Sequence, residues 1–188
     1  MSVEQHTGRR NPFGLVAVVA GCLLMAAMWG YYFFVASDEG VYQLTDTSWR
    51  QAAEPICAAA QDERLALADT SSGFIEEPTL EQMVQRADIV DRATDIVEEM
   101  LDSIAAIPVA TDRDRAVLEV FEENYRLVIA DRRRYTSQLR EGDASRYTET
   151  VVAGGPVTNV VSDFTAGVKG NNVPACSPPR ELANVREP

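Results

Sequence analysis

The sequence predicts an all-α protein, with an N-terminal transmembrane helix followed by an extracytoplasmic up-down four-helix bundle whose last helix is broken. Three observations support this: an uncharged apolar run near the N-terminus, two long segments with apolar residues three and four positions apart, and glycine and proline breaks after them. The 188 residues suffice for one modest folded domain. The formal net charge of −12 argues against nucleic acid as a partner, because phosphate binding needs clustered positive charge.

The apolar run covers residues 13–36 and contains no charged residue. About 20 apolar residues in a helix cross the core of a bilayer. Arg9 and Arg10 precede the run, so the positive-inside rule predicts that residues 1–12 are cytoplasmic and that the outer part begins at residue 37. We therefore expect a single-pass plasma-membrane protein with the lipid bilayer as one partner. A cleaved signal peptide and a lipoprotein acylated at Cys22 stay open as alternatives.

Cys57 and Cys176 are the only cysteines of the predicted outer part. Two cysteines in an oxidising compartment usually pair. Their disulfide would close a loop of roughly 120 residues and stabilise the fold by about 4–5 kcal/mol in the chain-entropy model. A reactive thiol has no support, because the single histidine, His6, lies before the apolar run.

The outer part divides into a connector over 37–47, a helical domain over 48–176 and a flexible tail over 177–188 that contains three prolines. The first helix of the domain is expected over 48–69, with Ser48 as its N-cap. Pro55 either kinks this helix or starts a new one.

Two longer helices carry the clearest pattern. Thr79 and Gln82 form a capping box for the second helix, which ends before Pro108, and the third helix runs from Thr111 to Gly142. The seam of the second helix contains Met83, Ala87, Val90, Thr94, Val97, Leu101 and Ile104. The seam of the third contains Leu118, Phe121, Tyr125, Val128, Arg132, Tyr135 and Leu139. Because only a short turn joins them, the two helices should be antiparallel neighbours.

The fourth helix of the bundle is expected in two pieces. Residues 146–153 form the first piece, Gly154, Gly155 and Pro156 break it, and residues 157–170 resume helical spacing. A strand stays open as an alternative here, because the segment contains pairs of β-branched valines.

Five carboxylates lie three or four positions apart on one face of the second helix. They are Asp88, Asp91, Asp95, Glu98 and Asp102. Such a stripe could gather cations, but calcium sites usually need a curved loop that also offers carbonyl oxygens, so a solvated face is the preferred interpretation. No histidine is available in the outer part for a di-iron site or a Ser–His–Asp site. We therefore predict no metal site, no cofactor and no catalytic residues.

Arg132, Arg133 and Arg134 form a basic cluster on the third helix. Folding this helix back about the turn near Val109 places Arg132 close to Arg86 and Asp88. Salt bridges to the acidic face are the preferred interpretation, and an anion or lipid-headgroup site is the alternative.

Arg132 falls on the apolar seam. Together with Thr94 and Tyr135 it forms either a ligand site between the helices or a polar contact in the core. Phe74 and Ile75, in the loop before the second helix, are either an exposed contact for a partner or a cap on the end of the bundle.

The layout resembles single-pass envelope proteins of high-GC Gram-positive bacteria. The residues that carry the resemblance are Arg9 and Arg10, the 13–36 segment, Trp49, the Ile56–Cys57 pair and the Pro174–Cys176 segment. In such proteins a helical outer domain carries one cysteine early and one at its end. The resemblance implies location and architecture, and it implies no assigned activity.

From these observations we expect a non-enzymatic, membrane-anchored protein whose helical outer domain contacts another envelope protein or the cell wall. The alternative is a sensor-like outer domain that binds a small molecule or an ion. A hydrolase that uses paired carboxylates ranks third, because the acids are abundant but no pair is singled out. The partner and the oligomeric state stay open.

Overall fold

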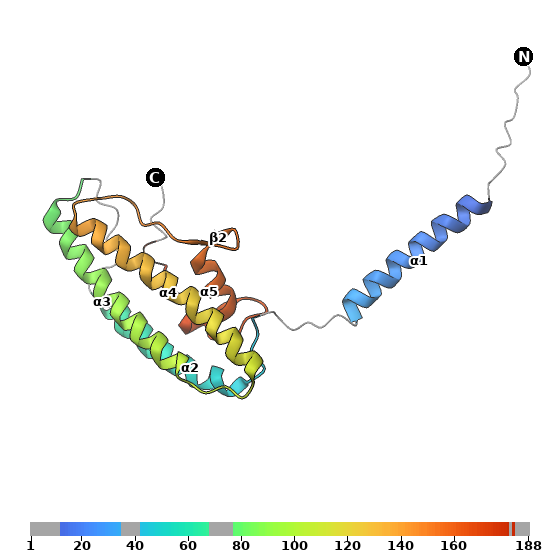
Figure 1. Ribbon diagram of the computed structural model, residues 1–188, viewed down its shortest axis with the longest axis horizontal. Coiled ribbons are helices and arrows are strands. Elements are labelled where there is room, and N and C mark those ends of the chain that lie inside the picture. The colour runs from blue at the N-terminus through green and yellow to red at the C-terminus, as the bar shows by residue number, and fades with distance from the viewer. Residues whose placement is uncertain (1–11, 35–41, 68–76, 181, 183–188) are drawn as a thin grey trace, which may run out of the picture. The chain divides into compact units, whose positions relative to one another are not determined.

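The computed structural model describes residues 12–34, 42–67, 77–180 and 182, and these residues are mostly helical (Figure 1). The chain divides into two compact units, Met1–Glu39 and Gly40–Pro188. The first contains helix α1, Pro12–Phe34, and the second contains all the other described elements.

The prediction of a transmembrane helix over 13–36 is wrong. In the part of the chain that the structure describes, no helix combines the length and the apolar character needed to cross a bilayer. Helix α1 ends at Phe34, so the last two residues of the predicted segment, Val35 and Ala36, lie outside the described residues. The single-pass topology and the plasma-membrane location depended on this segment and are corrected with it.

Three long helices form most of the second unit: α2, Thr47–Ala66, α3, Leu80–Ala105, and α4, Asp112–Arg140. The predicted capping box of α3 is confirmed, because Thr79 accepts the backbone N–H of Gln82 while Gln82 accepts that of Thr79. Asp46 rather than Ser48 caps α2. Pro55 is accommodated within α2 on its exposed side.

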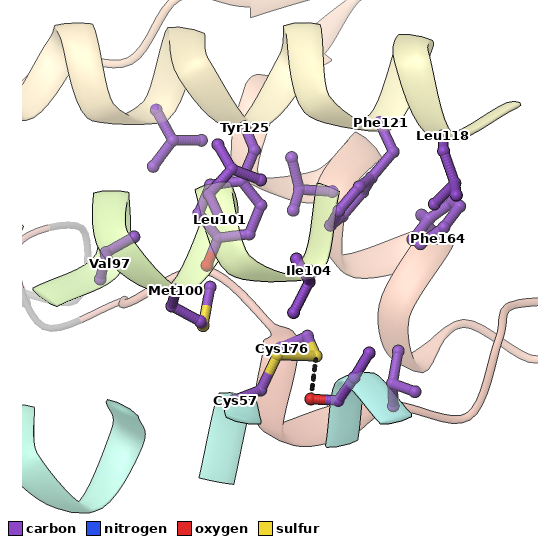
Figure 2. Close-up of a cluster of buried hydrophobic side chains, with 14 of the residues drawn as sticks. Cys57, Val97, Met100, Leu101, Ile104, Leu118, Phe121, Tyr125, Phe164 and Cys176 are labelled. Carbon is purple, nitrogen blue, oxygen red and sulfur yellow. Dashed lines mark hydrogen bonds between the residues drawn. A yellow bond between two sulfur atoms is a disulfide. The ribbon is translucent and has the colours of Figure 1, made fainter. Parts of the chain in front are cut away.

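The two predicted seams are confirmed, because every seam residue of α3 and α4 is buried. The larger core cluster lies where α2, α3, α4 and the C-terminal elements meet (Figure 2). Trp49 is fully buried there, donates its indole N–H to the carbonyl of Ile104 and makes edge contacts with Phe121 and Phe164. The sequence periodicity therefore identified which faces of the long helices are buried.

The register between α3 and α4 differs from the predicted one. Arg132 lies against Thr94, about two helical turns from the expected neighbours Arg86 and Asp88. The cause is the connection over 106–111, which contains Pro108 and is not helical. Because of this connection, the first turns of α4 extend beyond the C-terminal end of α3.

The predicted first piece of the fourth helix is wrong. Residues 143–150 form neither helix nor strand, and strands β1, Val151–Val152, and β2, Gly155–Pro156, form an antiparallel hairpin. The β-branched valines favour strand, and Ala153 and Gly154 adopt the positive φ that a two-residue hairpin turn requires. Helix α5, Val157–Ala166, then ends four residues before the expected Gly170.

A short 3₁₀ helix, η1, Pro174–Cys176, carries the second cysteine to α2. The predicted Cys57–Cys176 disulfide is confirmed, with the two Cα atoms 4.9 Å apart (Figure 2). The segment expected to be a flexible tail is packed at its start, since Pro178 and Pro179 are buried and Leu182 is only 5% exposed. Leu182 joins a second apolar cluster with Met83 of α3 and Leu139 of α4.

Candidate functional site

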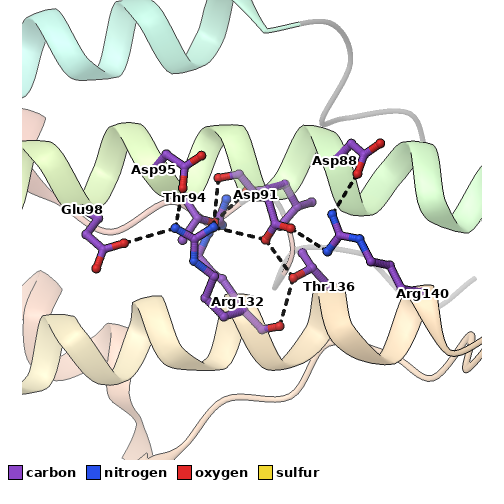
Figure 3. A network of polar contacts seen from close by, with 10 residues as sticks. Asp88, Asp91, Thr94, Asp95, Glu98, Arg132, Thr136 and Arg140 are labelled. Atoms are coloured by element: carbon purple, nitrogen blue, oxygen red, sulfur yellow. Dashed lines mark hydrogen bonds and ion pairs between the residues drawn. The ribbon is translucent and has the colours of Figure 1, made fainter.

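The predicted acidic stripe of α3 faces three arginines of α4, which we call the arginine ladder: Arg126, Arg133 and Arg140. Figure 3 shows Arg140 of the ladder beside Asp88 and Asp91 of the stripe. Arg140 pairs with Asp88 and Asp91, Arg133 with Asp91, Asp95 and Glu98, and Arg126 with Asp102. Every carboxylate of the stripe is thus part of an ion pair. The stripe is a contact between helices, and nothing in this arrangement favours cation binding.

Asp91 is the most strongly held member of the stripe. Burial alone raises the pKa of its carboxyl, but hydrogen bonds from Thr136 and Arg140 outweigh that effect and leave the pKa below its ordinary value. Among the described residues, no cluster of three or more histidine, cysteine or acidic side chains could hold a metal ion.

The three residues of the predicted ligand site, Thr94, Arg132 and Tyr135, do lie in one region and all are buried. The guanidinium Nε of Arg132 donates to the hydroxyl of Thr94 over 2.9 Å, and Arg132 is 1% exposed. Tyr135 packs edge-on against Tyr147, with 5.7 Å between ring centres. These side chains contact the protein itself, which favours the polar core contact over the ligand site.

A buried polar site that the sequence did not indicate fixes the segment before α2. Asp114, fully buried in the first turn of α4, accepts hydrogen bonds from the N–H groups of Thr45 and Asp46 and from the Thr45 hydroxyl. Asn171 is also fully buried; its amide oxygen accepts the N–H of Leu44, and its amide nitrogen donates to the carbonyl of Tyr42. Residues 42–46 are thereby held against α4 and against the segment after α5.

Open concave space occurs where α4 extends beyond α3. We call it the hollow; its volume is about 340 Å³. Its apolar lining includes Trp49, Ile107, Val109, Leu118 and Phe121. Figure 2 shows Leu118 and Phe121 pointing from α4 toward Phe164 in the same core. The floor of the hollow therefore lies over the aromatic part of the core, where Trp49 is fully buried and Phe121 is 4% exposed.

The rim of the hollow carries charged residues, and only some of them form ion pairs. Glu122 forms an ion pair with Arg126 over 2.8 Å. Arg115 and Glu119 are exposed and form no ion pair with any described residue. The last turn of α3, which ends at the hollow, contains no basic residue, so nothing on this helix offsets the partial negative charge of its C-terminus.

The hollow could not be predicted from the sequence, because it depends on how far α4 extends past α3. Pro108 indicates the end of a helix, but a proline alone does not indicate how far the next helix extends. The other predicted contact point, Phe74 and Ile75, lies outside the described residues.

Comparisons with protein-family models, with curated proteins and with solved structures found no match. The site therefore rests on the geometry of this chain alone.

Proposed function

We propose that the unit beginning at Gly40 is a non-enzymatic binding domain that contacts another protein through the hollow. The observation that carries this proposal is the hollow itself, in which an apolar floor reaches the core and charged side chains without ion pairs stand on the rim. Protein interfaces combine such an apolar centre with a polar rim. The other candidate features support the fold, because the acidic stripe pairs with the arginine ladder and Arg132 donates to Thr94.

A small-molecule ligand is the second candidate function. The volume of about 340 Å³ lies at the lower end of the range for pockets that bind small molecules. The proposal of a protein partner takes precedence because the rim charges are exposed and widely accessible, whereas a small-molecule site usually encloses its polar groups.

Site-specific photo-crosslinking tests the proposal. A photoreactive amino acid replaces Glu119 at the rim in one full-length variant and Glu63, exposed on α2, in the matched control. Both variants are irradiated in the cells that naturally produce the protein. We expect one reproducible adduct with a second protein from position 119 and not from position 63.

The protein identified in this way is then purified and its affinity is measured directly. We expect Val109→Asp, which places a charge in the hollow, to weaken binding by about tenfold or more. Val120→Asp is the control, because Val120 is 46% exposed on α4 and does not line the hollow. Unfolding curves establish that both variants are folded. Equal adducts at the two positions, or an affinity indifferent to Val109→Asp, would refute the proposed function.

A further inference from the structure

We propose that the partner presents a basic segment that inserts one apolar side chain into the hollow, with lysine or arginine side chains facing Glu119 and the C-terminal end of α3. This inference rests on the proposed function and names the chemistry of the partner. Its first support is charge. Among the described residues, the charged ones that line the hollow are two acids, Glu119 and Glu122, and one base, Arg115.

The second support is that the protein's own basic residues neutralise the negative charge at the hollow only in part. The guanidinium of Arg126 donates hydrogen bonds to both Asp102 and Glu122, and these hydrogen bonds raise the pKa of Arg126. Glu119 has no such partner among the described residues. A cation from outside would therefore find a free carboxylate at the edge of an apolar surface, next to the negative end of a helix dipole.

The third support is shape. The hollow is about the size of one large side chain with part of its backbone, and aromatic rings lie beneath it. An apolar anchor would bury its surface against Ile107, Pro108 and Val109, which line the hollow and are partly or fully exposed, while flanking cations stay at the solvent-exposed rim. Such an arrangement gives affinity through the anchor and selectivity through the charges.

Arg115 supplies a sharp test, because it is the one basic residue among the described residues that line the hollow. It should oppose a basic partner. Arg115→Ala is therefore expected to tighten binding, a result that a purely structural role for this exposed side chain would not produce.

The experiment measures the fluorescence anisotropy of short labelled peptides with the full-length protein. The reference peptide has one phenylalanine flanked by lysines; a second replaces the phenylalanine by alanine, and a third replaces the lysines by glutamates. We expect the reference peptide to bind with salt-sensitive affinity. We expect the alanine peptide to bind about tenfold more weakly and the glutamate peptide not to bind measurably.

Variants of the protein distinguish binding of the peptide at the hollow from non-specific attraction of a basic peptide to an acidic protein. Glu119→Lys should lower the affinity for the reference peptide by about tenfold, and Arg115→Ala should raise it. Glu99→Gln, which changes an exposed acid on α3 away from the lining, should change this affinity by less than about twofold. Equal binding of the phenylalanine and alanine peptides, or of the lysine and glutamate peptides, would overturn the proposed partner chemistry. The crosslink from position 119 would then still decide whether the hollow binds a protein at all.

Discussion

Asp46 and Asp114 hold each other's segments in place. The carboxylate of Asp114 accepts the N–H of Asp46 over 3.0 Å, and the carboxylate of Asp46 accepts the N–H of Ala110, just before α4, over 3.3 Å. Each aspartate thus satisfies backbone donors at the start of the other's helix. This exchange fixes the beginning of α2 beside the part of α4 that extends beyond α3, and so positions Trp49 beneath the hollow.

Asp114→Asn should therefore lower the free energy of unfolding by about 2–3 kcal/mol, because three donors lose a charged acceptor that is itself fully buried. Chemical denaturation monitored by circular dichroism measures the change. Asp112→Asn, exposed in the same helical turn, serves as the control and should cost less than about 1 kcal/mol. An equal loss in both variants would contradict the role assigned to Asp114.

The seams of α3 and α4 could be predicted because apolar spacing is a local property of each helix. Their register could not, because it depends on the path of residues 106–111, which contain Pro108 and are not helical. The buried Asp114 and Asn171 were also missed. A polar residue at a helix start or in a glycine-rich loop usually faces water, and only the tertiary fold brings these two to residues 42–46.

Stability should fall in acid through carboxylates whose pKa is lowered in the fold. The pKa values of Asp91 and Asp114 lie below the ordinary 3.8, because hydrogen bonds outweigh the opposing effect of burial. Their stabilising contribution is complete above the unfolded-state pKa and is lost as the pH falls from there through the folded-state value. Urea unfolding measured from neutral pH down to about pH 2 should show a decline that begins near the ordinary pKa. Asp91→Asn should reduce the slope of this decline, and an unchanged slope would exclude Asp91 as a contributor.

Arg132 should tolerate change least among the arginines of α4. Arg132→Ala removes a buried stem and the donor to Thr94, so we expect a loss of about 2–3 kcal/mol in the free energy of unfolding. Arg126→Ala, with a side chain 44% exposed, should cost less than about 1 kcal/mol despite its two ion pairs. Similar melting temperatures for the two variants would place Arg132 outside the core.

The Cys57–Cys176 disulfide should contribute about 4–5 kcal/mol to stability in the chain-entropy model, because it joins residues 119 apart in the sequence. Replacing both cysteines by serine, followed by denaturant unfolding, measures this contribution. Cys22→Ser is the control, since Cys22 is an exposed free cysteine of the first unit. Stability independent of the disulfide would mean that η1 is held to α2 by packing alone.

Leu182 should anchor the C-terminal segment. Leu182→Ala should lower the free energy of unfolding by about 2 kcal/mol, because the side chain is buried with Met83 and Leu139. Val168→Ala, at a fully exposed position, should have little effect. Limited proteolysis provides a second measurement, in which the Leu182 variant is expected to lose its C-terminal residues faster than the wild-type protein.

The arginine ladder has a consequence for how the helices find their alignment. Its members are spaced by seven residues, and Asp88, Asp95 and Asp102 of the acidic stripe are spaced by seven as well. If α4 slid along α3 by two turns, most of the arginines would again form ion pairs, but with different carboxylates. The surface ion pairs therefore favour several alignments of the two helices almost equally. The contact between Arg132 and Thr94 breaks this degeneracy, because it occurs once and is buried. A chain without that contact would be expected to populate a slipped isomer, compact and helical, in which the hollow has a different shape.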